Sequence, residues 1–323
     1  MAFSLAYHFG YNMITLVPFK KNLVRPVTVF KGTTDTREGF YLEWFFEGTL
    51  FKAEVSPLDP SLLPEIKEHL ETHKDNFEKL LLEALAAAKS PWDFKVPSPF
   101  SQVRFAICSL FLEARNLTDI TCKIQGFLDM KDTEVLIKIR NLIENNVSIC
   151  KFKIDPSNIV TSQLLLQKIM SRTNFTFRLD ANQSMSLNEA IDFSKDLPHA
   201  RIEYFEEPLQ TPQLLEEFYA ETGFKYALDE SLNTDSLPAD HHGLSAIVVK
   251  PSLVGDFADL TKLLKSKIPP ITISSTYETD VGLRHLVLWA QILNPDGSHG
   301  LDTFDIFEES SNFQIRDGKI VYV

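Results

Sequence analysis

Three acidic residues stand at matched places in the sequence, each at the end of a short apolar run. Asp180, Glu206 and Asp229 close these runs, as in the segment Phe175–Asp180. Carboxylates gathered around one point repel one another, and a bound divalent cation relieves that repulsion. Ligands that are all oxygen suit Mg²⁺ or Mn²⁺ rather than Zn²⁺. The three acids therefore predict a Mg²⁺ site, with Mn²⁺ possible, if the fold brings their strand ends together.

Lysines end two further apolar runs and predict proton chemistry beside that metal. Lys151 and Lys153 share one face of a strand because side chains alternate with a period of two, and Lys250 closes another strand. A buried lysine needs a partner. In strand order Lys153 and Lys250 fall on either side of Glu206, so they would face a metal-bound carboxylate substrate from opposite sides. A lysine that removes an α-proton needs a pKa lowered from about 10.4 to roughly 7–8.

The elements that must position these groups alternate between strand and helix over most of the chain. Such alternation predicts a parallel sheet. The functional residues end successive strands 21 to 27 residues apart, as active residues do at one end of an α/β barrel, and no glycine-rich nucleotide motif is present. We therefore predict an α/β fold, a modified (β/α)7β TIM-type barrel with a short eighth strand near 300–304. The predicted strands are 122–128, 149–154, 175–180, 202–206, 226–229, 246–250 and 271–275.

The first part of the chain has a different pattern. Aromatic and β-branched residues predict antiparallel strands at 11–19, 27–30 and 39–51, followed by a helix to about residue 88 that is broken near 73–75. A proline-rich joint follows at 90–99. These features predict an α+β capping domain over 1–97 and a barrel domain over 98–304. The segment 305–323 is expected to pack back on the capping domain.

The composition limits the classes of partner. The net charge is −12, from 44 acidic and 32 basic residues, which argues against nucleic acid. Three cysteines (Cys108, Cys122 and Cys150) form no disulfide or zinc pattern and favour a reducing compartment. No apolar run is long enough to span a membrane, and residues 1–15 do not resemble a signal peptide. We expect a cytoplasmic protein that acts on a small carboxylate; its oligomeric state is not predicted.

Five motifs together resemble the enolase superfamily, in its muconate-lactonizing branch. They are Lys-Phe-Lys, Leu-Asp-Ala-Asn, Glu-Glu-Pro, Asp-Glu-Ser and Lys-Pro, in this order and spacing over most of the chain. The resemblance implies that Asp180, Glu206 and Asp229 bind Mg²⁺, that Lys153 is the base and that Lys250 is the opposing lysine. It also implies an N-terminal capping domain. Asn182 and Glu230 would lie beside the acids and support the metal site without binding the metal.

Within that branch, three segments resemble the o-succinylbenzoate synthases of menaquinone biosynthesis: 178–182, 273–283 and 300–303. This implies a lyase that dehydrates 2-succinyl-6-hydroxy-2,4-cyclohexadiene-1-carboxylate with syn geometry. The substrate would be contacted by Lys151, Arg178, Ser274, Ser275 and Gly300. Alternatively, Arg178 forms an interior ion pair beneath the metal, and the two serines only shape a strand-end turn.

Other interpretations stay open at this stage. Two opposed lysines would equally support racemisation of N-acylamino acids or epimerisation of dipeptides on the same scaffold. A barrel that binds ligands without catalysis is a third possibility, which the intact acid and lysine sets argue against. The chain departs from the family in one motif: where members often carry Gly-Trp-Gly-Glu near the end of the capping sheet, it has Phe51–Glu54. We expect this change to alter cap packing and to remove no catalytic group. His241, His242 and His299 are expected to be structural or solvated.

Overall fold

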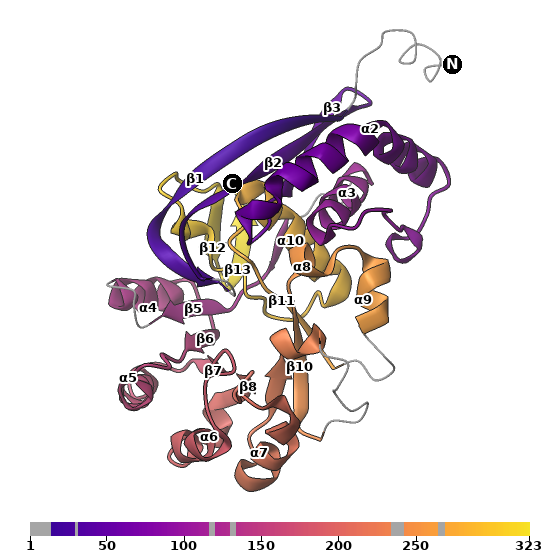
Figure 1. Ribbon diagram of the computed structural model, residues 1–323. Coiled ribbons are helices and arrows are strands. Elements are labelled where there is room, and N and C mark those ends of the chain that lie inside the picture. Colours follow the sequence, from indigo (N-terminus) through magenta and orange to yellow (C-terminus); the bar gives the residue numbers. More distant parts are fainter. Residues whose placement is uncertain (1–13, 30–31, 116–119, 130–133, 234–241, 264–268) are drawn as a thin grey trace.

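The computed structural model of the chain describes residues 14–29, 32–115, 120–129, 134–233, 242–263 and 269–323 (Figure 1). An antiparallel sheet opens the chain, in which β1 (Ile14–Val29), β2 (Gly32–Phe46) and β3 (Thr49–Val55) pair in sequence order. The single strand predicted over 39–51 is wrong, because a turn with Gly48 at φ 80° separates β2 from β3. A left-handed backbone of this kind favours glycine.

Two helices cover this sheet, α2 (Leu63–Ala86) and α3 (Ser101–Ala114) (Figure 1). The break predicted near residues 73–75 is wrong, since α2 runs without interruption. Its buried side chains form one stripe at helical spacing, so packing carries the helix through that polar stretch. The stripe consists of Ile66, Leu70, Phe77, Leu81 and Ala84. Sheet and helices thus share one apolar core.

The rest of the chain is dominated by a seven-stranded parallel sheet whose strands are neighbours in sequence order. A parallel sheet with this strand order and with helices on its outside is that of a TIM-type barrel. The predicted fold class is therefore confirmed. The strands are β5 (Gly126–Asp129), β6 (Ile149–Lys153), β7 (Thr176–Asp180), β8 (Ile202–Glu206), β9 (Tyr226–Leu228), β10 (Leu244–Val249) and β11 (Ile271–Ile273). The helices are α4 (Val135–Glu144), α5 (Ile159–Met170), α6 (Leu187–Ser194), α7 (Leu215–Thr222), α8 (Pro251–Val254), α9 (Phe257–Leu263) and α10 (Asp280–Leu293).

A two-residue segment, His299–Gly300, joins the two ends of this sheet. Gly300 bridges Ser274 next to β11, and His299 bridges Ile124 next to β5, both in parallel orientation. Four backbone hydrogen bonds of 2.8–3.1 Å hold the segment on its two sides. The eighth strand predicted near 300–304 is therefore reduced to these bridges, and a 3₁₀ turn follows at Phe304–Ile306. We call this joint the barrel seam.

A third, small sheet attaches the C-terminus. The strand predicted over 122–128 is in fact two strands, because β4 (Thr121–Lys123) leaves the barrel and pairs with β13 (Lys319–Tyr322). β13 in turn pairs with β12 (Phe313–Arg316). Phe307 also bridges Leu23 of β1. The domain limits inferred from the sequence stay a prediction. Among the described residues, no helix is both long and apolar enough to cross a membrane.

His299 serves the seam rather than the chemistry. Its side chain is fully buried, Nδ1 accepts from the backbone N–H of Ile273 at 3.0 Å, and Nε2 lies 2.9 Å from the carbonyl oxygen of Asn294. Only the neutral ring with its proton on Nε2 satisfies both partners. The pKa of His299 is lowered from 6.5 to about 4, chiefly by burial and in addition by the charge of Arg178, against the opposing effect of the hydrogen bond to Asn294. The structure supports the expectation of a structural role.

We expect acid to weaken this seam. The pKa of His299 is lower in the folded protein than in the unfolded chain. Its contribution to the free energy of unfolding is therefore complete above pH 6.5 and falls as the pH drops towards 4. The contribution of His299 to the free energy of unfolding should be about 2 kcal/mol smaller at pH 5 than at pH 7.5. Urea unfolding at both pH values measures this. His299→Gln should flatten the pH dependence, whereas the control His73→Gln in α2 should not; equal slopes for wild type and His299→Gln would contradict the assignment.

Candidate active site

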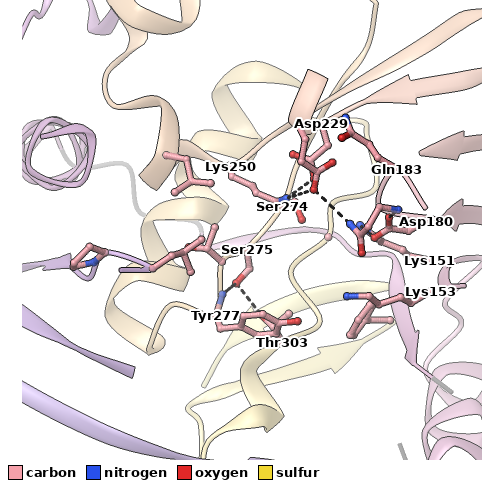
Figure 2. Close-up of a pocket in the computed structure, with 18 of the residues that line it drawn as sticks. Lys151, Lys153, Asp180, Gln183, Asp229, Lys250, Ser274, Ser275, Tyr277 and Thr303 are labelled. Atoms are coloured by element: carbon pink, nitrogen blue, oxygen red, sulfur yellow. Dashed lines mark hydrogen bonds and ion pairs between the residues drawn. The ribbon is translucent and has the colours of Figure 1, made fainter. Parts of the chain in front are cut away.

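A cavity of about 730 Å³ lies at the carboxyl ends of the barrel strands, beneath the capping domain. Its apolar lining includes Pro57, Leu58 and Leu62 from the cap side, together with Phe127 of β5. Most of its polar lining comes from residues at or after the carboxyl ends of the strands, and Gln125 just before β5 adds to it. These polar residues include Gln125, Lys151, Lys153, Asp180, Asn182, Gln183, Asp229, Glu230, Lys250, Ser274, Ser275 and Gly300. Figure 2 shows several of these side chains converging. The structure thus brings the predicted strand-end residues to one place.

The three acids occupy the positions that the sequence predicts. Asp180 and Glu206 are the last residues of β7 and β8, and Asp229 follows β9; they are 3%, 1% and 7% exposed. Lys151 holds the first two together, with Nζ 2.7 Å from Asp180 Oδ2 and 2.8 Å from Glu206 Oε1. Lys250 forms an ion pair with Asp229. Each buried carboxylate therefore has a cationic partner, as buried charge requires.

Glu206 is the least satisfied of the three acids. Its pKa is raised to about 8, chiefly by burial and in addition by the charges of Asp180 and Asp229, against the opposing effect of Lys151. One of its oxygens, Oε2, is buried and has no hydrogen-bond partner among the described residues. At Asp180, by contrast, Lys151 and Lys153 outweigh burial and lower the pKa. A buried oxygen without a partner marks a place where a bound cation would compensate the cost of burial.

The chemistry of these donors fits an oxygen-preferring divalent cation. Three carboxylates end adjacent strands, and no sulfur or imidazole stands among the lining residues. In the described part of the chain, however, no three acidic, histidine or cysteine side chains are close enough to ligate one ion as arranged. The ammonium group of Lys151 lies between Asp180 Oδ2 and Glu206 Oε1. These contacts leave Oε2 of Glu206 for a cation.

Lys153 and Lys250 face the cavity from opposite sides (Figure 2). Lys153 is the last residue of β6, and its side chain makes no hydrogen bond or ion pair with any described residue. Lys250 follows β10, and besides Asp229 its Nζ lies 3.9 Å from Glu230 Oε1. Burial disfavours the charge of Lys250, but the carboxylates of Asp229 and Glu230 raise its pKa above the ordinary value. The two lysines therefore differ: one is unpaired and one is held by acids.

Glu207 fastens three strand ends to one another, a role that the sequence did not predict. Its Oε1 accepts from the backbone N–H groups of Asp229 and Ser231, each at 2.8 Å. Its Oε2 accepts from Ser231 Oγ at 2.7 Å and from Gln183 Nε2 at 3.0 Å. The only signal in the sequence is its place beside Glu206 in Glu-Glu-Pro. Because Glu207 is 1% exposed and satisfied on both oxygens, it orients the neighbouring acids rather than a ligand.

A second buried acid, Glu278, shapes the loop after β11. It accepts from Ser275 Oγ at 2.8 Å and from both the backbone N–H and the hydroxyl of Thr276. In that loop Tyr277 has φ 65°, a strained conformation for an aromatic residue, and its carbonyl accepts from Arg37 Nε at 3.2 Å. Arg37 belongs to β2, so the cap holds this cavity wall in place.

Glu54, the acid of the altered cap motif Phe51–Glu54, has a structural role. Glu54 Oε2 accepts from the backbone N–H groups of Thr279 and Gly282 at 2.9 and 3.1 Å, and thereby caps the N-terminus of α10. Its other oxygen accepts from Ser56 Oγ at 2.6 Å. Burial raises the pKa of Glu54. The interpretation that this motif affects cap packing agrees with these contacts.

The remaining predicted site residues divide into two groups. Ser274, Ser275 and Gly300 line the cavity, and the hydroxyl of Ser275 is already bound to Glu278. Arg178 does not line it: its guanidinium lies among Glu203, Gln125, Thr272 and the carbonyl of Ser298. The alternative of an interior ion pair for Arg178 thus agrees with the geometry.

Asn182 and Glu230, which were predicted to support the acids, line the cavity. The backbone N–H of Asn182 donates to Asp180 Oδ1 at 3.0 Å, and its Nδ2 lies 3.4 Å from Glu230 Oε1. Asn182 has φ 44°, a conformation that asparagine tolerates better than most residues. His242 lies outside the cavity lining, and His241 lies outside the described residues.

Comparisons of sequence agree with this architecture. Residues 134–237 match the family "Enolase C-terminal domain-like". The o-succinylbenzoate synthase of Proteus mirabilis is 27% identical over 284 residues, which cover 85% of this chain and 84% of that enzyme. The o-succinylbenzoate synthase of Photorhabdus laumondii is 28% identical, with 91% of each chain covered. Part of the chain thus matches an enolase family model, and most of it is similar to o-succinylbenzoate synthases.

Several solved enzyme structures share the fold. MenC from Desulfotalea psychrophila has a TM-score of 0.70 at 20% identity, covering 95% of this chain and 99% of that one. The o-succinylbenzoate synthase of Thermosynechococcus elongatus, complexed with Mg in its active site, has a TM-score of 0.64 at 20% identity over 92% and 95%. A dipeptide epimerase of Enterococcus faecalis reaches 0.68 at 15% identity over 96% of both chains. The fold alone therefore does not separate these activities.

Proposed function

We propose that this protein is an o-succinylbenzoate synthase, a lyase of menaquinone biosynthesis. It would dehydrate 2-succinyl-6-hydroxy-2,4-cyclohexadiene-1-carboxylate to o-succinylbenzoate. The observation that carries the proposal is the placement of Lys153 and Lys250 on opposite sides of one cavity, beside three buried strand-end acids. The similarity to curated synthases over most of the chain supports this choice of substrate. A cytoplasmic location is also proposed, because all three cysteines are free and buried.

The metal site in this proposal consists of Asp180, Glu206 and Asp229. Their oxygen donors and the unpartnered Oε2 of Glu206 support Mg²⁺, with Mn²⁺ possible. When bound, Mg²⁺ draws negative charge from the substrate carboxylate and so lowers the cost of removing the neighbouring proton. Lys151 forms ion pairs with two of the acids and would limit the repulsion among them whether or not the metal is bound.

The protein's own groups then account for the elimination. Lys153 Nζ removes the ring proton next to the carboxylate, and the C–H electron pair becomes part of the new ring double bond. The carbon–oxygen bond to the hydroxyl breaks, and the proton carried by Lys153 goes to that hydroxyl, which leaves as water. One lysine on one face makes the dehydration syn. Lys250, on the other face, stabilises the negative charge that develops meanwhile, and the apolar cap residues Leu58 and Leu62 exclude water.

The proposed function has a direct test in the loss of absorbance of the cyclohexadiene substrate. We expect turnover with Mg²⁺, its loss on addition of EDTA, and recovery when excess Mg²⁺ is restored. The EDTA effect separates metal-dependent chemistry from spontaneous aromatisation of the substrate. Wild-type protein that is folded and loaded with Mg²⁺ but leaves the diene unchanged would contradict the synthase.

Racemisation of N-acylamino acids or epimerisation of dipeptides is the second candidate. The same opposed lysines favour it, since removal of a proton on one face and return on the other inverts a carbon centre. Exchange of the α-proton of N-succinylamino acids or dipeptides with deuterium from solvent, followed by NMR, distinguishes this activity. Exchange without diene turnover would place the racemase or epimerase first.

A further inference from the structure

The two opposed lysines are fixed to the barrel in different ways. Lys153 is the last residue of β6, and the sheet pairs it with Asp129 on one side and Asp180 on the other. Lys250 lies one residue beyond β10, after Val249, the last residue of that strand that the sheet pairs. The sheet therefore holds the backbone of Lys153 directly, whereas the backbone of Lys250 needs another support.

That support comes from α8, a single helical turn that begins directly after Lys250. The carbonyl oxygen of Lys250 accepts from the backbone N–H groups of Leu253 and Val254 at 2.9 and 3.1 Å. Pro251 stands at the first helical position, where its fixed φ favours the start of a helix. The direction in which the Lys250 side chain leaves the backbone is thus set by the position of α8.

A buried acid from the next loop holds the start of α8. Ser252 is 4% exposed, and its hydroxyl donates to Glu278 Oε1 at 2.7 Å. Glu278 is 1% exposed and also accepts from Ser275 Oγ and from the N–H of Thr276, at 2.8 and 2.7 Å. A buried carboxylate is costly unless donors surround it, and here the donors come from two segments. Glu278 therefore joins α8 to the loop after β11.

The other end of α8 is held independently by Arg104 of α3. Its Nη2 lies 3.4 Å from the carbonyl oxygen of Val254, and its Nε donates to Asp259 at 2.6 Å. Gly255, at φ 117°, lets the guanidinium approach, since an added Cβ atom would lie 2.7 Å from that Nε. Loss of the bond at the start of α8 would therefore free mainly the end next to Lys250.

We propose that Glu278 is a positioning residue for Lys250, acting through Ser252 and α8. Neither Glu278 nor Ser252 is among the residues that line the cavity, so their effect on the reaction passes through the backbone. The inference rests on the proposed function, in which Lys250 stabilises the charge that develops on the face opposite Lys153. Its ammonium group must be placed closely, because a shift of about 1 Å can lower a rate roughly 10²-fold.

Amide exchange tests the structural half of this proposal without any turnover. Hydrogen–deuterium exchange followed by NMR reports on the N–H groups of Leu253 and Val254, which donate to the Lys250 carbonyl. Ser252→Ala should speed their exchange roughly 10-fold, because local opening of α8 then breaks one hydrogen bond fewer. The control Ser194→Ala removes a buried hydroxyl of α6 that donates to the carbonyl of Ile191, and should leave both amides unchanged.

Single-turnover rates of diene dehydration test the catalytic half. Ser252→Ala should lower the maximal rate about 10-fold, but change the half-saturating diene concentration and the Kd for Mg²⁺ less than about twofold. In a Lys250→Ala background the same substitution should change the rate less than about twofold, since the group that it misplaces is gone. A role in stability alone would give the same loss with and without Lys250.

Glu278→Gln tests the acid itself. The substitution keeps the volume and one acceptor oxygen but removes the charge that collects the donors. It should lower the rate at least as far as Ser252→Ala, and the double variant should be little slower than Glu278→Gln alone. Full additivity of the two losses would show that Ser252 does not act through Glu278 and would overturn the inference.

Diene turnover by wild type is measured separately and tests the proposed function alone. If wild type instead exchanges the α-proton of a dipeptide, the synthase is contradicted, and that exchange rate replaces the diene rate in the same set of variants. If it does neither, the amides decide: faster exchange in Ser252→Ala supports the inference. A folded Ser252→Ala protein with wild-type amide exchange overturns it in every case, as does an equal loss of rate in the Lys250→Ala background.

Discussion

Lys153→Ala is expected to lower kcat for dehydration by about 10³-fold or more. Lys153 would both take the ring proton and return it to the leaving hydroxyl, so its removal affects two proton transfers, and a positioned acid–base group contributes roughly 10²–10⁴-fold. Folding should be unaffected, because the side chain of Lys153 makes no hydrogen bond or ion pair with a described residue. Stopped-flow absorbance with the diene, in excess Mg²⁺, measures the chemical step.

Two further variants separate proton transfer from charge. Lys153→Arg keeps the positive charge but cannot act as a base near neutral pH, so it should be as inactive as Lys153→Ala. Lys250→Arg should retain more activity than Lys250→Ala, since Lys250 would act by its charge. Lys168→Ala, on the exposed surface of α5, is the matched control and should behave as wild type. Full activity in Lys153→Ala would overturn the mechanism.

Asp180→Asn is expected to weaken Mg²⁺ binding by at least 10-fold. The substitution preserves shape but removes a negative charge from the proposed ligand set, and hard divalent cations depend on charged oxygen ligands. It also removes one of the two acids that hold Lys151, so the ammonium group would be drawn towards Glu206 alone. Calorimetric titration with Mg²⁺, or Mn²⁺ followed by electron paramagnetic resonance, measures the affinity without requiring turnover.

The control for this titration is Asp192→Asn, which removes an exposed carboxylate on α6. It should leave the Mg²⁺ affinity unchanged, because a surface charge at that distance is screened by salt. An unchanged affinity in folded Asp180→Asn would exclude Asp180 from the metal site. A weakened affinity in both variants would indicate an effect of net charge rather than of a ligand.

Much of the fold could be predicted because local pattern and tertiary structure agree along the barrel strands. The run from Ile202 to Glu206 is a strand with those limits, and β6, β7 and β10 lie within one or two residues of their predicted limits. Side-chain alternation decides which residues face inward, so Asp180 and Glu206 are buried at the cavity end as expected. The wrong predictions concern strands whose pairing partners are distant in the sequence. β4 separates from β5 because β4 pairs with β13, at the other end of the chain.

The sequence by itself determined which residues end the barrel strands, and hence the acids and lysines of the candidate site. This was possible because strand order and the period of two are local properties. Only the tertiary structure decided what those residues contact. It bonds Lys151 to two acids, turns Arg178 away from the cavity, and places Gln125 beside Gly300, 175 positions later in the chain. Such contacts depend on barrel closure at the seam, which joins segments that no local pattern relates.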